Sequence, residues 1–244
     1  MPSNENTILA IRDMFNSFVP ALSPVALTDT SDTDKNSIVT KYNSLLPDVF
    51  AIESHGLTQG TGIATYDTYG GSPFISGLST ELTTGSTRFA FLGSCNSYVI
   101  GQNMMNSGFG AKAVISYTDC PKEYQCSDFD YDFFMSATVF DETIQVSYAS
   151  AYAAEVAAYL WVANPVNYGL VWVAVETWRG ANGGAYPSND VVAGIIGVIG
   201  FGVIPAFTVR AAAEYWLSIY SEHPITLVLP RLDGNGALTL TSWS

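Results

Sequence analysis

Two side chains that can do chemistry each follow a short apolar run. His55 follows Val-Phe-Ala-Ile-Glu-Ser at residues 49–54, and Cys95 follows Phe-Ala-Phe-Leu-Gly-Ser at residues 89–94. A cysteine thiolate is a nucleophile, and an imidazole whose pKa is near 6.5 exchanges protons close to neutral pH. A Cys and a His brought together therefore supply the nucleophile and the general acid/base that hydrolysis of an amide bond requires.

The apolar runs before these residues predict strands of a parallel sheet. A third run spans residues 111–119, and segments long enough for crossover connections separate the three runs. Ligands bind outside the carboxyl ends of such strands, so His55 and Cys95 are expected to share one crevice. Eight apolar side chains of the runs are expected to be largely buried: Val49, Phe50, Ile52, Phe89, Phe91, Leu92, Val114 and Ile115.

Two motifs carry a family resemblance. The first is Ser54-His55-Gly56, followed by a Gly-rich turn, and the second is Phe91-Leu92-Gly93-Ser94-Cys95. Together they resemble the His-Gly and Cys blocks of the caspase-like cysteine peptidases, a superfamily that includes caspases, legumain, gingipain, clostripain and the CHAT peptidases. The resemblance implies a three-layer α/β sandwich, with a mostly parallel central sheet flanked by helices. It also implies a cysteine endopeptidase that needs no cofactor or metal, with Cys95 as nucleophile and His55 as acid/base.

The resemblance also implies further site residues. The backbone N–H groups of Gly56 and Cys95 are the expected donors to the oxyanion, and Gly56 lets the acyl group approach closely. In the superfamily the end of the third strand lines the pocket for the residue before the scissile bond. Ser116, Tyr117 and Asp119 are therefore expected substrate contacts. Asp119 either attracts a basic side chain or is a plain turn residue. Aspartate specificity is not expected, because Gly93 stands where caspases have a Gln.

The other two cysteines lie close together in the sequence. Cys120 and Cys126 flank five residues that are expected to form a loop. They either form a disulfide or remain as two thiols. A metal site built on this pair is disfavoured, because no His or further Cys lies nearby.

Composition excludes one class of partner and favours others. The 244 residues carry a formal charge of −13 with only nine Lys plus Arg, so a nucleic-acid-binding surface is not expected. A peptide or protein substrate is the expected partner. The low charge and the many hydroxyl and amide side chains favour an extracytoplasmic or cell-surface location. Met1–Thr7 lacks the basic and apolar regions of a signal peptide.

The resemblance implies a caspase-like α/β domain at residues 1–165. Residues 7–19 and 34–46 predict helices, the second capped by Asp34, and the expected strand before the first helix is missing or shortened to residues 6–10. Further helices are expected at 72–83, 98–106, 133–140, 147–161 and 211–220, a short strand at 23–28, and a hairpin arm at 60–68. Residues 166–244 are expected to pack on the same domain as a strand at 169–175, an apolar Gly-rich segment and a hairpin turning at 233–236.

The Gly-rich segment Val191–Val209 allows two interpretations. Its nineteen uncharged residues would span about 28 Å as a helix, close to the thickness of a bilayer core. Its glycines and Pro205 favour a buried hairpin or a contact between copies of the chain instead. The alternative function is accordingly a catalytically inactive caspase-like fold that serves as a structural, self-assembling or membrane-associated protein.

Overall fold

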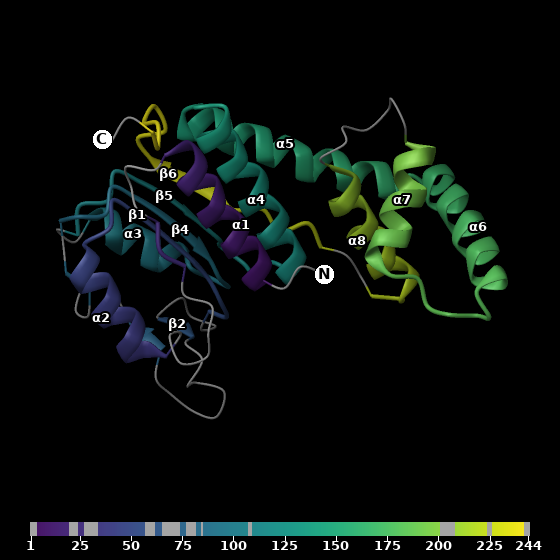
Figure 1. The fold of residues 1–244 in the computed structure, drawn as a ribbon, viewed down its shortest axis with the longest axis horizontal. Helices are drawn as coiled ribbons and strands as arrows, with labels where there is room; N and C mark the ends of the chain where they lie inside the picture. Colours follow the sequence, from purple (N-terminus) through teal and green to yellow (C-terminus); the bar gives the residue numbers. More distant parts are fainter. Residues whose placement is uncertain are drawn as a thin grey trace. The chain divides into compact units, whose positions relative to one another are not determined.

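The computed structural model shows a mixed α/β protein (Figure 1). It describes residues 4–19, 24–26, 34–56, 62–64, 74–76, 82–83, 85–106, 109–200, 208–223 and 226–241. The chain divides into two compact units. One is an α/β unit formed by Pro2–Ala149 together with Val228–Ser244, and the other is a helical unit formed by Ser150–Leu227.

A four-stranded sheet is the centre of the α/β unit. Its strands lie in the order β1 (Val49–Glu53), β4 (Phe89–Gly93), β5 (Ala113–Ser116) and β6 (Arg231–Gly234). The first three run parallel and are the three apolar runs of the sequence, whereas β6 pairs antiparallel with β5. The prediction of neighbouring parallel strands is confirmed, so the segments that follow β1 and β4 leave the sheet at the same edge.

Side chains of β4 alternate between the two faces of the sheet, as the pleat requires. On one face Phe89 and Phe91 pack against the aromatic side chains of α4 (Glu123–Val139), with centroid separations of 5.4 Å for Phe89–Phe133 and 6.3 Å for Phe91–Phe129. Burial of each such side chain stabilises the fold by roughly 1.5–3 kcal/mol. This face carries the aromatic half of the core.

The opposite face of the sheet is covered by α2 (Lys35–Leu45) and α3 (Tyr98–Asn106). There Ala90 and Leu92 of β4 share an apolar cluster with Tyr42 of α2 and with the buried side of α3. Helix α1 (Asn4–Phe18) packs on α4 instead, with Phe15 against Phe134 at 5.7 Å. Figure 1 shows the resulting three layers.

Burial of the three apolar runs follows their place in the sheet. The side chains of β4 and β5 are fully buried, as predicted for Phe89, Phe91, Leu92, Val114 and Ile115. Val49, Phe50 and Ile52 are buried less completely, and Phe50 and Ile52 pack against the apolar cluster beneath α2 and α3. The reason is that β1 has β4 as its only neighbour in the described sheet.

The first two helices lie where the sequence places them. Helix α1 contains residues 6–10, so the shortened first strand considered there is not formed. Asp34 caps α2, because its carboxylate accepts a hydrogen bond from Ser37 N at 3.0 Å. A hydrogen bond from the Ser37 hydroxyl, and secondarily this backbone bond, lowers the pKa of Asp34.

Several short elements differ from the sequence-based predictions. The prediction of a helix at residues 72–83 is wrong, because β3 (Phe74–Ser76) pairs antiparallel with β2 (Gly62–Ala64). Residues 24–26 are not in a strand, and the rest of that predicted strand, like most of the hairpin arm at 60–68, lies outside the described residues.

The prediction of a C-terminal hairpin is also wrong. Strand β6 pairs with β5 rather than with a following strand, and Thr239 instead bridges Thr143. Gly234 ends β6 with a φ of 93°, and a Cβ on this residue would collide with the carbonyl oxygen of Lys112. The glycine at this turn therefore lets the chain pass close to the residue that precedes β5. This close approach, rather than a hairpin, accounts for the Gly-rich stretch at residues 233–236.

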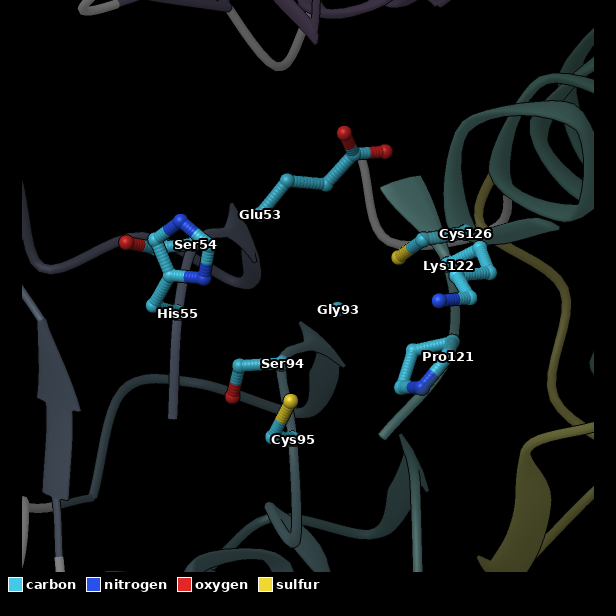
Figure 2. Close-up of a pocket in the computed structure, with 9 residues that line it drawn as sticks. All are labelled: Glu53, Ser54, His55, Gly93, Ser94, Cys95, Pro121, Lys122 and Cys126. Atoms are coloured by element: carbon cyan, nitrogen blue, oxygen red, sulfur yellow. The ribbon is translucent and has the colours of Figure 1, made fainter. Parts of the chain in front are cut away.

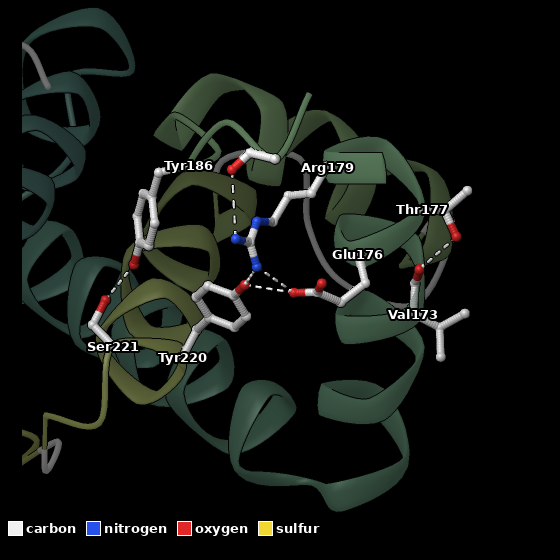
Figure 3. A network of polar contacts seen from close by, with 8 residues as sticks. Val173, Glu176, Thr177, Arg179, Tyr186, Tyr220 and Ser221 are labelled. Carbon is white, nitrogen blue, oxygen red and sulfur yellow. Dashed lines mark hydrogen bonds and ion pairs between the residues drawn. The ribbon is translucent and has the colours of Figure 1, made fainter. Parts of the chain in front are cut away.

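The helical unit contains the C-terminal part of α5 (Ile144–Ala163), α6 (Pro165–Ala181), α7 (Asn189–Ile199) and α8 (Val209–Tyr220). Trp216 of α8 stacks between Tyr168 and Tyr220, at centroid separations of 5.5 and 4.8 Å. Figure 3 shows the polar network that joins α6 to α8. Tyr220 donates to Glu176 at 2.5 Å, and Arg179 donates to both residues.

The strand predicted at residues 169–175 is wrong, because these residues lie within α6. Asn164 caps this helix, Pro165 occupies its first turn, and Val171 and Val175 form the buried stripe four residues apart. The two compact units divide within α5, between Ala149 and Ser150, and the chain returns to the α/β unit at Val228.

The apolar segment Val191–Val209 does not form one long helix. Helix α7 ends at Ile199, Gly200 caps it, and residues 201–207 lie outside the described part. Among the helices that the structure describes, none combines the length and apolar character needed to cross a membrane.

Candidate active site

A pocket of about 230 Å³ lies where β1 and β4 end (Figure 2). Two walls are the strand ends themselves, residues 53–55 and 93–95, which include His55 and Cys95. The third wall is Pro121 and Lys122, which precede α4, together with Cys126 in its first turn. The sequence thus located the crevice and two of its walls, but it missed the third.

Pairing between β1 and β4 continues up to the pocket. Glu53 lies opposite Gly93, and the N–H of Ser54 then donates to the Gly93 carbonyl at 3.0 Å. His55 directly follows Ser54, and Cys95 lies two residues beyond Gly93. The side chain of His55 is exposed and that of Cys95 is half-buried, so both are accessible from the pocket.

Gly56 fixes the His segment against the Cys segment. A Cβ on Gly56 would collide with the carbonyl oxygen of Cys95 and would lie 3.0 Å from its nitrogen. On its other side Gly56 bridges the buried Ile63 of β2. Only a residue without a side chain permits this contact, so the His-Gly pair of the sequence has a structural basis.

The turn that carries Cys95 is tied to the end of β5. The Ser97 hydroxyl donates to the Leu92 carbonyl at 2.7 Å and accepts from Tyr117 N at 3.0 Å. Asn96, with a φ of 55°, donates its N–H to the Asp119 carbonyl at 3.2 Å. These bonds hold Cys95 just before the N-terminus of α3, where the helix dipole favours a thiolate.

Cys95 forms a disulfide with Cys120, so Cys120 and Cys126 neither pair with each other nor remain as two thiols, and both alternatives considered for them are wrong. The reason is the sheet topology. Because β4 and β5 are parallel neighbours, the residues that follow them meet at one edge although 25 positions separate them. Cys126 is a buried thiol outside this disulfide. While the disulfide is intact, Cys95 has no thiolate, so nucleophilic chemistry at this residue requires that the bond be opened.

The expected substrate contacts after β5 do not line the pocket. Ser116 and Tyr117 are buried, and the Ser116 hydroxyl lies 3.1 Å from the position that a Cβ of Gly101 in α3 would occupy. Asp119 is exposed, and its carboxylate accepts the N–H of Cys120 at 2.8 Å. Ser116 and Tyr117 thus belong to the core beneath α3, whereas Asp119 belongs to the loop that holds the disulfide.

Glu53 is a pocket residue that the sequence analysis did not single out. A Cβ on Gly93 would be 3.0 Å from Glu53 Cγ, so the glycine leaves room for this side chain to cross toward α4. There the Glu53 carboxylate accepts from the Ser127 hydroxyl at 3.2 Å. The available signal was an acidic residue at the last position of an apolar strand.

Glu53 also meets the fully buried Asp130. Burial raises the pKa of Asp130 well above its usual range, and the charge of Glu53 and a hydrogen bond between the two carboxyl groups raise it further. Two carboxylates cannot hydrogen-bond without a proton, and the buried partner is the one that keeps it. Next to the Cys/His pair the pocket wall thus holds the carboxyl group of Glu53 and, behind it, that of the buried Asp130, which binds a proton more tightly than an exposed Asp does.

Within the described part of the chain, no group of three or more His, Cys, Asp or Glu side chains is arranged to hold a metal ion. Comparison of the chain with protein-family models gives no match, and comparison with curated proteins finds no significant similarity.

Proposed function

We propose that the chain is a cysteine-type peptidase with a caspase-like arrangement of its site, in which Cys95 is the nucleophile and His55 the acid/base. One observation carries the proposal. Both residues line a single pocket at the carboxyl ends of adjacent parallel strands, and Gly56 packs directly on the Cys95 backbone.

The chemistry needs three functions from these residues. The Cys95 thiolate attacks the carbonyl carbon of a peptide bond, and the N–H groups of Gly56 and Cys95 donate to the resulting oxyanion. His55 gives a proton to the leaving amine and later takes one from the water that hydrolyses the thioester. The exposed position of His55 suits a group that must exchange protons with both substrate and solvent.

This reaction requires a reduced Cys95. Two electrons and two protons from a thiol reductant convert the Cys95–Cys120 disulfide into two thiols. Cys120 is exposed, so a small reductant reaches the bond from solvent. The proposal therefore predicts an enzyme that is latent when oxidised and active when reduced.

Alkylation of Cys95 tests the nucleophile directly. A Cys120→Ala variant removes the disulfide partner of Cys95, and after reduction and removal of the reductant we expect iodoacetamide to modify Cys95 at a pH well below the ordinary thiol pKa of about 8.5. Adding His55→Ala should slow this modification at neutral pH. If Cys95 in the Cys120→Ala variant reacts no faster than a denatured thiol, the peptidase proposal is wrong.

The disulfide itself favours a second candidate function, that of a structural protein in which the caspase-like site is inactive. In that case the Cys95–Cys120 bond is a permanent staple between the ends of β4 and β5. Both single Cys→Ala variants would then lower stability equally, and neither would change any hydrolytic activity. A Cys120→Ala variant with a thiol-dependent peptidase activity excludes this candidate.

A further inference from the structure

All three cysteines of the chain gather at one edge of the sheet. Cys95 and Cys126 line the same pocket, and Cys120 is bonded to Cys95. Figure 2 shows the sulfur atoms of Cys95 and Cys126 both pointing toward the middle of the pocket. A thiol beside a disulfide is the arrangement that thiol–disulfide exchange requires.

We propose that Cys126 is an exchange thiol, which moves the disulfide from Cys95–Cys120 to Cys120–Cys126 and thereby releases Cys95. The consequence for activity rests on the proposed peptidase function, whereas the exchange itself does not. The two pairings are then two states of one switch, the first latent and the second competent for catalysis.

Gly93 provides the space for the Cys126 thiol. A Cβ on Gly93 would be 2.5 Å from Cys126 Sγ, and Gly93 precedes Cys95 by two residues on the same strand end. The sulfur of Cys126 therefore lies over the backbone that leads into the disulfide. Any larger residue at position 93 would push this thiol away from the site.

The segment between Cys120 and Cys126 is short, and it begins outside any helix or strand. Cys120 is exposed and lies outside any helix or strand, and Pro121 and Lys122 lead from it into the first turn of α4. A disulfide needs the two Cα atoms to approach to roughly 5–6 Å. Movement of these residues and of the first turn, whose Cys126 N–H bonds the Lys122 carbonyl at 3.2 Å, brings Cys120 and Cys126 together.

The exchange is balanced and needs no external oxidant or reductant. The Cys126 thiol loses its proton to solvent, and its thiolate attacks Cys120 Sγ. The Cys95–Cys120 bond then breaks as the Cys120–Cys126 bond forms, and Cys95 leaves as a thiolate. Attack falls on Cys120 because the better leaving group is the thiolate of lower pKa, and Cys95 lies at the N-terminus of α3.

Peptide mapping of the full chain tests the exchange. Lys112 and Lys122 place the three cysteines on different tryptic peptides, so each pairing gives a distinct mass under non-reducing conditions. The oxidised protein is incubated at pH 8 with iodoacetamide and then digested. We expect Cys120–Cys126 peptides together with alkylated Cys95, and no alkylation of Cys95 in a Cys126→Ser variant, which has no thiol to open the disulfide.

The Cys126→Ser variant must also be shown to fold, so that slow or absent labelling is not caused by a disrupted site. Cys126→Ser, reduced and then alkylated, shows by thermal unfolding and by labelling of Cys95 that the site is folded. Formation of a Cys95–Cys126 pair, or Cys95 alkylation at the same rate in Cys126→Ser, overturns the proposal, as does the absence of any exchange in the parent. Exchange without any Cys95-dependent hydrolysis would instead contradict the peptidase proposal and leave the exchange intact.

Discussion

Gly56 lies directly against the backbone of Cys95, which locks the His-bearing segment to the Cys-bearing turn. The contact joins residues that follow two different strands, so it depends on the parallel register of β1 and β4. The geometry of the candidate site is therefore built into the backbone and does not depend on the side chains of His55 and Cys95.

A Gly56→Ala change is expected to disrupt this contact. The added methyl group would force the two segments apart, and overpacking of this kind costs typically 1–3 kcal/mol of unfolding free energy. Urea denaturation measures that loss, and iodoacetamide labelling in a Cys120→Ala background measures the loss of Cys95 reactivity. Gly169→Ala is the matched control, because a Cβ there meets nothing within 4 Å and the helical position should be stabilised slightly.

Opening the disulfide is expected to lower the stability of the α/β unit. Cys95 and Cys120 are 25 residues apart, and closure of a loop of that size stabilises a fold by about 3 kcal/mol. Denaturant midpoints of the parent with and without a thiol reductant measure this difference. A Cys95→Ala/Cys120→Ala double variant should not respond to reductant, and a response of equal size there would show that the loss arises elsewhere.

The stability of the α/β unit is expected to fall as the pH rises. Burial, and secondarily the charge of Asp128, raise the pKa of Asp132 from 3.8 to about 7, and Asp130 shifts in the same direction. Groups with a raised folded-state pKa bind protons more tightly in the folded state, so the contribution of Asp132 is complete below pH 4 and is lost as the pH passes 7.

An Asp132→Asn variant isolates this effect. For Asp132 the loss between pH 5 and pH 8 is roughly 2 kcal/mol of unfolding free energy. The variant should therefore be more stable than the parent at pH 8 and show a weaker dependence on pH, as measured by urea denaturation at several pH values. Parallel curves for the two proteins would contradict the assignment.

The α/β core was predictable because each element has a local signal. The three apolar runs gave β1, β4 and β5, and the carboxyl-end rule for parallel sheets brought His55 and Cys95 to one pocket. The partner of Cys120 was not predictable from spacing, since the nearer Cys126 lies in a helix and the distant Cys95 follows the neighbouring strand.

The prediction of one other element and of one site residue failed for different physical reasons. The run Gly169–Val175 is rich in β-branched residues, but Val171 and Val175 are four apart and the caps at Asn164 and Pro165 favour a helix. Glu53 was missed because its one local signal, an acidic residue at the end of an apolar strand, does not tell a pocket residue from a solvated strand end. Its role depends on Asp130, which α4 brings to it from far along the chain.

Hydrolysis of a denatured protein by the Cys120→Ala variant tests the central claim most directly. A denatured protein presents every type of side chain before a peptide bond, so the measurement does not depend on specificity, and new amino termini are counted by mass spectrometry. The account predicts new termini with Cys120→Ala and none with Cys95→Ala/Cys120→Ala or His55→Ala/Cys120→Ala. Equal cleavage by all three variants, or none by a Cys120→Ala variant whose Cys95 thiol reacts with iodoacetamide, would contradict it.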